Sequence, residues 1–255
     1  MKTYNLYEVG GCVRDRLLGL KSKDIDYSFE FTEESREHMK DWSVVAHYGR
    51  MNAILRAEGF DIFLMTKDCF TTRARFPKDH KHSNLTADFV MCRKETYPHS
   101  DSRKPEVEVG TLFDDLRRRD FTMNAIAEDD DGNLIDPFNG IQDIRDKIIR
   151  CPIDAETSFN DDPLRMLRAL RFSITKGFSI TGDISKVIKN DVEMWSKFSK
   201  VVSQERIREE IYKMMKHDTV GTIRTLKWYD EKSTHHILEK IFAEGMWLKP
   251  TTEKK

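Results

Sequence analysis

Two aspartates, Asp24 and Asp26, are separated by one apolar residue in a segment whose alternation predicts a β-strand over 24–31. Residues two apart on a strand face the same side, so the two carboxylates are expected to project together. Adjacent carboxylates repel each other unless a divalent cation lies between them. Mg²⁺ takes oxygen ligands from one or two carboxylates together with substrate phosphates. The pair therefore predicts a catalytic Mg²⁺ site, the alternative being two surface residues at the start of a strand.

A glycine pair, Gly10 and Gly11, precedes these aspartates, between a predicted strand and a predicted helix. Glycines at such a turn let backbone N–H groups approach a phosphate, and the start of a helix adds a favourable potential. Arg14, one turn into the helix, is suited to pairing with phosphate oxygens. Neither the Walker A pattern nor the dinucleotide fingerprint is present. The combination predicts a nucleoside triphosphate held above the metal site.

The stretch GGCVRDRLLGLKSKDID resembles the signature of the class II tRNA nucleotidyltransferases and their bacterial poly(A) polymerase relatives, in the polymerase-β-like superfamily. A second stretch, RRRDFTMNAIA, matches the family motif RRDFTxNA, which lines the nucleotide site. The resemblance implies that Arg119 pairs with phosphate and that Asp120 and Asn124 bond ribose hydroxyls. The alternative is a basic helix end in which Asp120 is an N-cap.

A third stretch, DDPLRMLRALRF, resembles the family helix EDPLRxLRAxRF. Asp162 and Arg165 lie at i and i+3, on one face of that helix. In the family this pair reads the incoming base, which implies that the carboxylate accepts from an exocyclic amine and the guanidinium donates to a neighbouring acceptor. Cytosine and adenine both carry an amine beside an acceptor, whereas uracil and guanine do not, so the resemblance implies CTP and ATP as substrates.

Arg168 and Arg171 continue a basic stripe on this helix that is suited to phosphates. The alternative for Asp162 is a helix N-cap before Pro163. One residue departs from the family pattern, because Asp161 stands where glutamate is usual. Its shorter side chain puts strict selection of C and A in question.

Asp88 lies on the strand predicted within 85–95, where the superfamily often places a third carboxylate that deprotonates the attacking hydroxyl. The alternative is an ordinary acid at a strand edge. The stretch QERIREEIYKMM resembles the last helix shared by the family and is expected to support the base-reading helix. Within it, Arg206 is interpreted as a solvated charge rather than a phosphate contact.

The elements that must position these residues fall into two parts. Residues 1–150 mix strand and helix signals, whereas 151–255 are predicted to be helical. The resemblance implies an α+β fold, with a polymerase-β-like nucleotidyltransferase head on a mixed sheet and an all-helical neck with a shortened C-terminal part. Residues 52–66 are predicted as two strands across a turn, and the basic stretch 66–84 as a loop.

Composition narrows the class of protein. The chain has 255 residues, of which 38% are apolar and 34% charged, and its net charge is -1. Aromatic residues at 10% argue against global disorder. Four cysteines without a CxxC pair argue against a zinc knuckle or a disulfide framework. No signal-peptide or membrane-spanning run is present, so a cytoplasmic protein without a membrane partner is expected.

The reaction implied by the resemblance is attack of an RNA 3′-hydroxyl on the α-phosphate of CTP or ATP, with release of pyrophosphate. Three hypotheses stay open: CCA addition or repair at a tRNA 3′ end, A-addition or poly(A) synthesis on tRNA or another RNA, and a non-catalytic RNA- or nucleotide-binding module. Only a short stretch follows the last motif. RNA is therefore expected to contact the basic stretches 73–81 and 117–119, the C-terminal stretch, or a homodimer partner.

Overall fold

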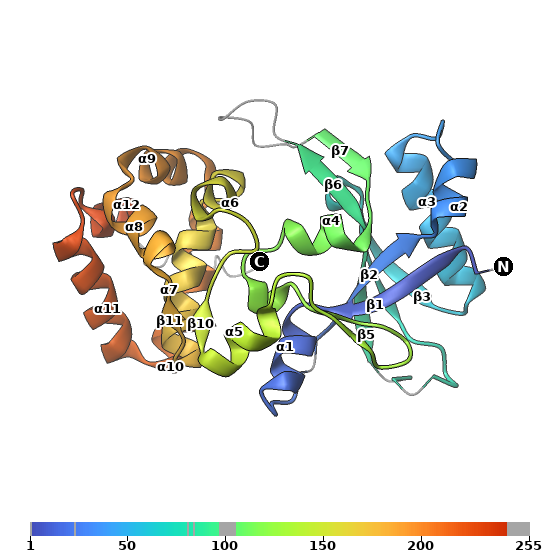
Figure 1. Ribbon diagram of the computed structural model, residues 1–255, viewed down its shortest axis with the longest axis horizontal. Helices are drawn as coiled ribbons and strands as arrows, with labels where there is room; N and C mark the ends of the chain where they lie inside the picture. Colours follow the sequence, from blue (N-terminus) through green and yellow to red (C-terminus); the bar gives the residue numbers. More distant parts are fainter. Residues whose placement is uncertain (1, 23, 81, 84, 97–105, 244–255) are drawn as a thin grey trace, which may run out of the picture. The chain divides into compact units, whose positions relative to one another are not determined.

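The structure is a computed structural model that describes residues 2–22, 24–80, 82–83, 85–96 and 106–243. The chain divides into two compact units, Met1–Asp146 and Lys147–Lys255 (Figure 1). All four cysteines are free thiols, in agreement with the absence of a CxxC pair. Within the described ranges, no helix has the length and apolar character needed to cross a bilayer.

A mixed sheet forms the centre of the first unit. Its seven strands are β1 (Tyr4–Val9), β2 (Ile25–Phe31), β3 (Asp61–Thr66), β4 (Thr71–Arg75), β5 (Thr86–Met91), β8 (Ala127–Glu128) and β9 (Leu134–Ile135). Their spatial order is β3-β4-β5-β2-β1-β8-β9. Strands β2 and β5 run parallel, and the other neighbouring pairs are antiparallel. This arrangement confirms the mixed sheet of the α+β fold predicted from the sequence.

Parallel pairing of β2 with β5 requires a crossover connection. The chain makes it through α2 (Glu33–His38), α3 (Val44–Ala57), β3 and β4. On α3, the side chains of Tyr48, Met51 and Leu55 are buried, at the i, i+3, i+7 spacing of one helix face. They share a core with Phe29 and Phe89 of the two parallel strands, which fixes the strands that carry the acidic residues.

Two predictions for this crossover were wrong. Residues 52–57 belong to α3 rather than to a strand, because Ser43 caps a helix whose buried face extends through Leu55. The predicted turn after α3 and the strand β3 are present. The basic segment 66–84 is not all loop, since β4 occupies its middle and pairs with both β3 and β5. Lys81 and Asn84 of that segment lie outside the described residues.

Seven further elements of the first unit lie outside the central sheet and the helices of the crossover. They are α1 (Gly11–Leu17), the 3-10 helix η1 (Lys67–Cys69), α4 (Leu112–Arg117), the 3-10 helix η2 (Thr122–Asn124) and α5 (Gly140–Asp146), together with a small antiparallel pair, β6 (Arg93–Thr96) and β7 (Glu106–Val109). Helix α4 begins with a capping box, in which Thr111 and Asp114 exchange side-chain and backbone hydrogen bonds. The two residues have the i, i+3 spacing that is typical of this box.

The second unit is helical apart from one short parallel pair, β10 (Ile148–Ile149) and β11 (Ser179–Ile180). Its helices are α6 (Ala155–Asp161), α7 (Leu164–Lys176), α8 (Gly182–Asn190), α9 (Val192–Val201), α10 (Gln204–His217), α11 (Thr219–Lys232) and α12 (Ile237–Phe242). Helix α7 ends at Gly177, whose φ of 68° is left-handed. Helix α10 packs on α7, and its side chains Ile207, Ile211 and Met214 are fully buried.

Candidate active site

Three carboxylates lie at one end of the parallel strand pair. Asp26 on β2 and Asp88 on β5 are partners in the register of that pair. Asp24 immediately precedes β2, one residue outside the strand. All three line one cavity of about 320 Å³, together with Arg73 of β4. The structure thus brings together the acidic residues that the sequence predicted to act jointly.

The electrostatics of this cavity favour a bound cation. Burial raises the pKa of Asp26 above its ordinary value. The guanidinium of Arg119 opposes that shift, while the charges of Asp88 and Asp24 reinforce it. A divalent cation would relieve the repulsion among these carboxylates.

The donor set also fits a hard divalent cation. It offers carboxylate oxygens, which such cations prefer over nitrogen and sulfur. Among the described residues, no group of three or more His, Cys, Asp or Glu side chains has the arrangement of a metal site. An open set of carboxylates is what a cation shared with substrate phosphates requires.

Gly10 forms a tight turn directly against Asp26, which belongs to the acidic row formed by Asp24, Asp26 and Asp88. Its φ of +77° lies in the left-handed region that favours glycine. A Cβ built at Gly10 would lie 2.8 Å from Nη1 of Arg119 and 3.7 Å from Oδ2 of Asp26. A Cβ at Gly11 would lie 3.6 Å from Nη2 of Arg14. The glycine pair therefore leaves room for two arginines and a carboxylate to converge at the start of α1.

Arg119 is held by a carboxylate that the sequence analysis missed, Asp115. The side chain of Asp115 has no exposed surface, and it accepts hydrogen bonds from Arg119 at 3.0 Å and from Ser28 of β2 at 2.7 Å. Burial alone would raise the pKa of Asp115, but the guanidiniums of Arg118 and Arg119 hold that pKa well below its ordinary value. Its position three and four residues before two arginines was the available sequence signal.

The remaining residues of the RRDFTxNA motif form a hydrogen-bonded chain. Arg14 donates to Oδ1 of Asn124 at 2.6 Å, and Asn124 donates to Oδ1 of Asp120 at 2.9 Å. The same Asp120 oxygen accepts from the backbone N–H of Phe121 at 2.8 Å. All three polar side chains are buried. These hydrogen bonds connect α1 to η2 and fix the side chains that are predicted to face the nucleotide.

In the second unit, Asp162 lies between α6 and α7. Its Oδ2 is ion-paired with Nη2 of Arg206 at 2.7 Å, and its Oδ1 accepts from the backbone N–H of Leu164 at 3.2 Å. Arg165 donates from Nη1 to the backbone oxygen of Ser158 at 3.1 Å and to its hydroxyl at 2.8 Å. The side chain of Arg206 is 50% exposed, which confirms the prediction of a solvated charge, and the structure adds its ion pair with Asp162.

Arg168 and Arg171, the basic stripe of α7, meet a second residue that the sequence analysis missed. Glu210 of α10 is only 3% exposed, and it forms ion pairs with Arg168 at 3.4 Å and with Arg171. The guanidinium of Arg171 also lies 3.9 Å from the ring centre of Phe172. The buried carboxylate of Glu210 thus fixes the orientation of both arginines.

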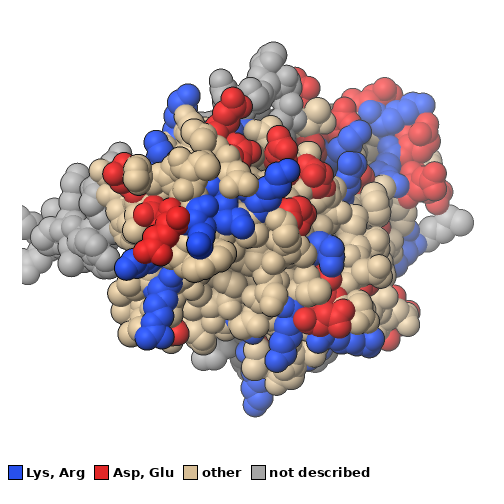
Figure 2. Space-filling view, turned by 60° about the vertical axis from the view of Figure 1, so that its left-hand side comes forward, with Lys and Arg blue, Asp and Glu red and all other residues tan. Residues whose placement is uncertain are grey.

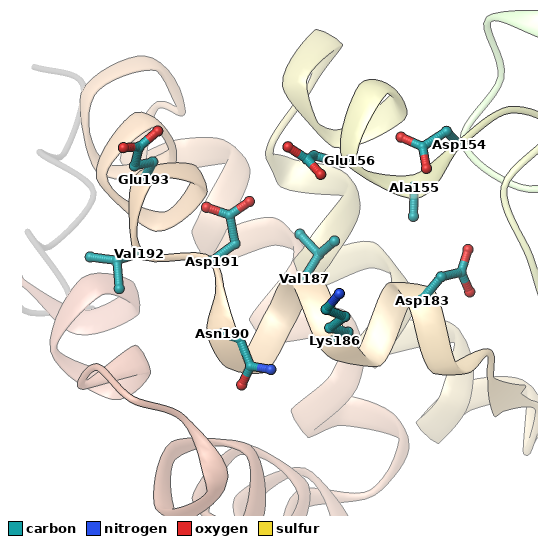
Figure 3. Close-up of a pocket in the computed structure, with 10 residues that line it drawn as sticks. All are labelled: Asp154, Ala155, Glu156, Asp183, Lys186, Val187, Asn190, Asp191, Val192 and Glu193. Carbon is teal, nitrogen blue, oxygen red and sulfur yellow. The ribbon is translucent and has the colours of Figure 1, made fainter.

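A cavity of about 490 Å³ in the same unit has a different character (Figure 3). Five carboxylates and one lysine are among its lining residues, which include Asp154, Glu156, Asp183, Lys186, Asp191 and Glu193. Asp154 and Asp191 already serve as N-caps, accepting from Thr157 at 2.9 Å and from Met194 at 2.8 Å. An acidic lining repels phosphates, and none of the predicted site residues belongs to it, so this cavity is not a candidate nucleotide site.

The first unit matches a known family. Residues 6–150 match the family described as the Poly A polymerase head domain. Two curated relatives extend the similarity into the second unit. The CCA-adding enzyme of Geobacillus thermodenitrificans is 32% identical over 248 residues, covering 96% of this chain and 54% of the relative. The A-adding tRNA nucleotidyltransferase of Aquifex aeolicus is 32% identical over 253 residues, covering 97% of this chain and 27% of the relative.

A solved structure agrees with these matches. The CCA-adding enzyme of Bacillus stearothermophilus in complex with CTP superposes with a TM-score of 0.68 and 29% identity, covering 92% of this chain and 49% of that one. The chain thus spans about half the length of most curated relatives it matches. Since the head-domain match covers more than half of the chain and includes the glycine turn, the paired aspartates and the RRDFTxNA motif, the chain belongs to the poly A polymerase head-domain family, as its resemblance to the class II tRNA nucleotidyltransferases predicted.

Proposed function

We propose that this protein is a template-independent RNA nucleotidyltransferase that adds CMP and AMP, from CTP and ATP, to a tRNA 3′ end. One observation carries the proposal: Asp24, Asp26 and Asp88 line a single cavity. The Gly10 turn and Arg119 lie against Asp26 at its side. Three carboxylates beside a glycine turn and an arginine suit metal-assisted nucleotidyl transfer. A protein that only binds RNA has little need of such a carboxylate cluster. The relatives named CCA-adding enzymes support the same assignment.

The catalytic steps are assigned to residues 1–150. Asp24 and Asp26 would hold Mg²⁺, which when bound supplies positive charge to the α-phosphate and to the departing pyrophosphate. Asp88 takes the proton from the attacking 3′-hydroxyl. The glycine turn, Arg14 and Arg119 bind the triphosphate. The buried side chains of Asp120 and Asn124 orient the ribose.

Base selection is assigned to residues 151–255. Asp162 accepts from the exocyclic amine of cytosine or adenine, and Arg165 donates to the adjacent ring acceptor. Arg168 and Arg171 add positive charge for the nucleotide phosphates while Glu210 holds them in place. Because a pair of side chains replaces a template, the two accepted bases are those that share this donor and acceptor pattern.

Binding of the RNA strand depends on local positive charge, since the net charge is -1. On the face shown in Figure 2, Lys and Arg side chains lie in several separate groups with Asp and Glu between them. Within the stretches proposed for RNA, Arg73, Arg75, Arg118 and Arg119 form ion pairs with carboxylates. Arg117 is exposed and is our first candidate for a phosphate contact. A homodimer partner is the alternative source of RNA-binding surface.

A second function in the same chemical class is A-addition to tRNA or another RNA. The relative from Aquifex aeolicus, named an A-adding enzyme, supports it with 32% identity over 253 residues. The two functions differ only in which nucleotide is accepted at which step.

The experiment that separates them is extension of a tRNA lacking its 3′ CCA, with Mg²⁺ and each labelled nucleoside triphosphate in turn. We expect incorporation of C followed by A. Incorporation of A alone would favour the second function, and no incorporation into any RNA would leave a binding module. The Asp24→Ala/Asp26→Ala double variant should lose incorporation, whereas Asp61→Ala, an exposed carboxylate paired with Arg75, should retain it. Full activity in the double variant would contradict the metal assignment.

A further inference from the structure

Arg73 faces the acidic row directly. In the antiparallel pairing of β4 with β5, it lies opposite Asp88. Its Nε donates to Oδ1 of Asp88 at 2.7 Å, and its Nη2 donates to Oδ2 at 2.6 Å. This two-pronged geometry engages both carboxylate oxygens at once. Because Asp88 in turn lies opposite Asp26, one row of Arg73, Asp88 and Asp26 crosses three neighbouring strands.

The pair is placed where it can open. The side chain of Arg73 is 49% exposed and that of Asp88 is 25% exposed, so water reaches both groups. Because water already reaches both groups, separating them exposes no buried charge, although the two-pronged geometry makes this pair stronger than most exposed ion pairs. The hydrogen bonds to Asp88, with its charge and the charges of Asp24 and Asp26, raise the pKa of Arg73, so the guanidinium stays charged throughout.

While Arg73 is in place, both oxygens of Asp88 accept N–H groups. A carboxylate engaged in this way is a poor cation ligand and a poor acceptor for a hydroxyl proton. A divalent cation held by Asp24 and Asp26 would share the cavity with this guanidinium, and the two positive charges would repel each other. Binding of the cation therefore opposes the ion pair between Arg73 and Asp88.

We propose that Arg73 is a positioning residue that neutralises Asp88 in the metal-free protein and, through its positive charge, opposes binding of the divalent cation to Asp24 and Asp26. The inference rests on the proposed function, since it assumes that the acidic row binds a metal. Binding of the cation releases the guanidinium from Asp88, which frees this carboxylate to accept the proton of the 3′-hydroxyl. Arg73 thereby lowers the affinity of the protein for the metal ion. Asp88 becomes available as a base only after the ion has bound.

A neighbouring arginine provides a matched control. Arg75 lies two residues further along β4 and pairs with Asp61 through one hydrogen bond at 3.1 Å. Asp61 does not line the cavity of the acidic row. Replacing Arg75 removes the same charge from the same strand without freeing Asp88. General effects of surface charge on cation binding will therefore appear equally in variants at both positions.

The test is a direct measurement of Mn²⁺ binding by electron paramagnetic resonance, with no substrate present. We compare the wild-type protein with Arg73→Met, Arg73→Lys and Arg75→Met, after confirming by circular dichroism that each is folded. We expect Arg73→Met to bind Mn²⁺ about fivefold more tightly, which corresponds to about 1 kcal/mol. Arg73→Lys keeps the positive charge but loses the two-pronged contact with Asp88, so its affinity for Mn²⁺ should rise about twofold. Arg75→Met should remain within about twofold of wild type.

Two results would overturn the inference alone: an unchanged or weaker affinity in both Arg73 variants, or an equal gain in Arg75→Met. In either case the wild type would still bind Mn²⁺, and the proposed function would stand. Absence of Mn²⁺ binding by the wild type, with the Asp24→Ala/Asp26→Ala variant indistinguishable from it, would overturn the inference and the metal assignment together.

Discussion

The carboxylate of Asp115 has no exposed surface and accepts a hydrogen bond from the guanidinium of Arg119 at 3.0 Å. The same carboxylate accepts from the hydroxyl of Ser28, which lies on β2 two residues after Asp26. One buried group on α4 thus joins the proposed phosphate-binding arginine, two residues beyond the end of that helix, to the strand that carries a proposed metal ligand. The position of Arg119 against the Gly10 turn depends on this junction.

The first prediction concerns the stability of that junction. Asp115→Asn keeps the shape of the side chain but leaves the guanidiniums of Arg118 and Arg119 without their buried counter-charge. Breaking a buried ion pair in this way costs about 3–5 kcal/mol in the free energy of unfolding. Urea denaturation measures the loss. Asp61→Asn, which breaks an exposed pair, should cost at most about 1 kcal/mol. A loss in Asp115→Asn no larger than that control would contradict the role of Asp115.

The second prediction concerns pH. The pKa of Asp115 is held below its ordinary value in the folded protein, so the folded state binds this proton more weakly than the unfolded state does. Its stabilising contribution is therefore complete above the unfolded pKa, about 3.9, and is lost as the pH falls below that value. The free energy of unfolding should fall more steeply between about pH 5 and pH 3 in the wild type than in Asp115→Asn. Parallel slopes in urea titrations would refute this assignment.

Local sequence patterns predicted the strand segments and the acidic residues of the site, but not every element between them. The alternation around Asp24 and Asp26 marks a strand because its apolar residues pack on one side of a sheet. Residues 52–57 carry apolar side chains that suit either a strand or a helix, and only the longer pattern from Ser43 through Leu55 identifies α3. Short apolar stretches are ambiguous for this physical reason.

The ion-pair partners of Asp88 and Asp162 could not be predicted, because they come from distant segments. Asp115, by contrast, lies only four residues before Arg119. Asp162 and Arg206 are 44 residues apart in sequence, and their ion pair depends on how α10 packs on α7. Arg73 reaches Asp88 through the register of two strands joined by a long connection. Motifs fix the types of the reacting residues, whereas tertiary packing decides which charge lies beside which.

The third prediction compares two glycines that both have a positive φ. Gly10 and Gly19 have φ values of +77° and +71°, so alanine is strained at either position. The Cβ of Gly10→Ala would lie 2.8 Å from Arg119, whereas nothing lies within 4 Å of a Cβ at Gly19. A shift of the phosphate-binding arginine by a fraction of an ångström should lower kcat/KM for nucleotide incorporation about 100-fold.

Gly19→Ala provides the control for strain in this comparison, and it should retain kcat/KM within about threefold of wild type once folded protein is counted. Thermal melts of both variants establish the folded fraction. Equal losses of incorporation in the two variants would show that backbone strain, rather than displacement of Arg119, accounts for the effect.

The fourth prediction concerns nucleotide selection by Asp162, whose carboxylate is fixed by Arg206 at 2.7 Å. Arg206→Ala leaves Asp162 with its backbone contact to Leu164 but frees its other oxygen to rotate. The preference for CTP or ATP over UTP, measured as a ratio of kcat/KM values, should therefore fall about tenfold. Lys227→Ala removes an exposed charge paired with Glu231 on α11 and should leave the ratio unchanged. A uniform loss of activity with all three nucleotides and an intact ratio would mean that Arg206 supports the fold of the unit but does not orient the base-reading carboxylate.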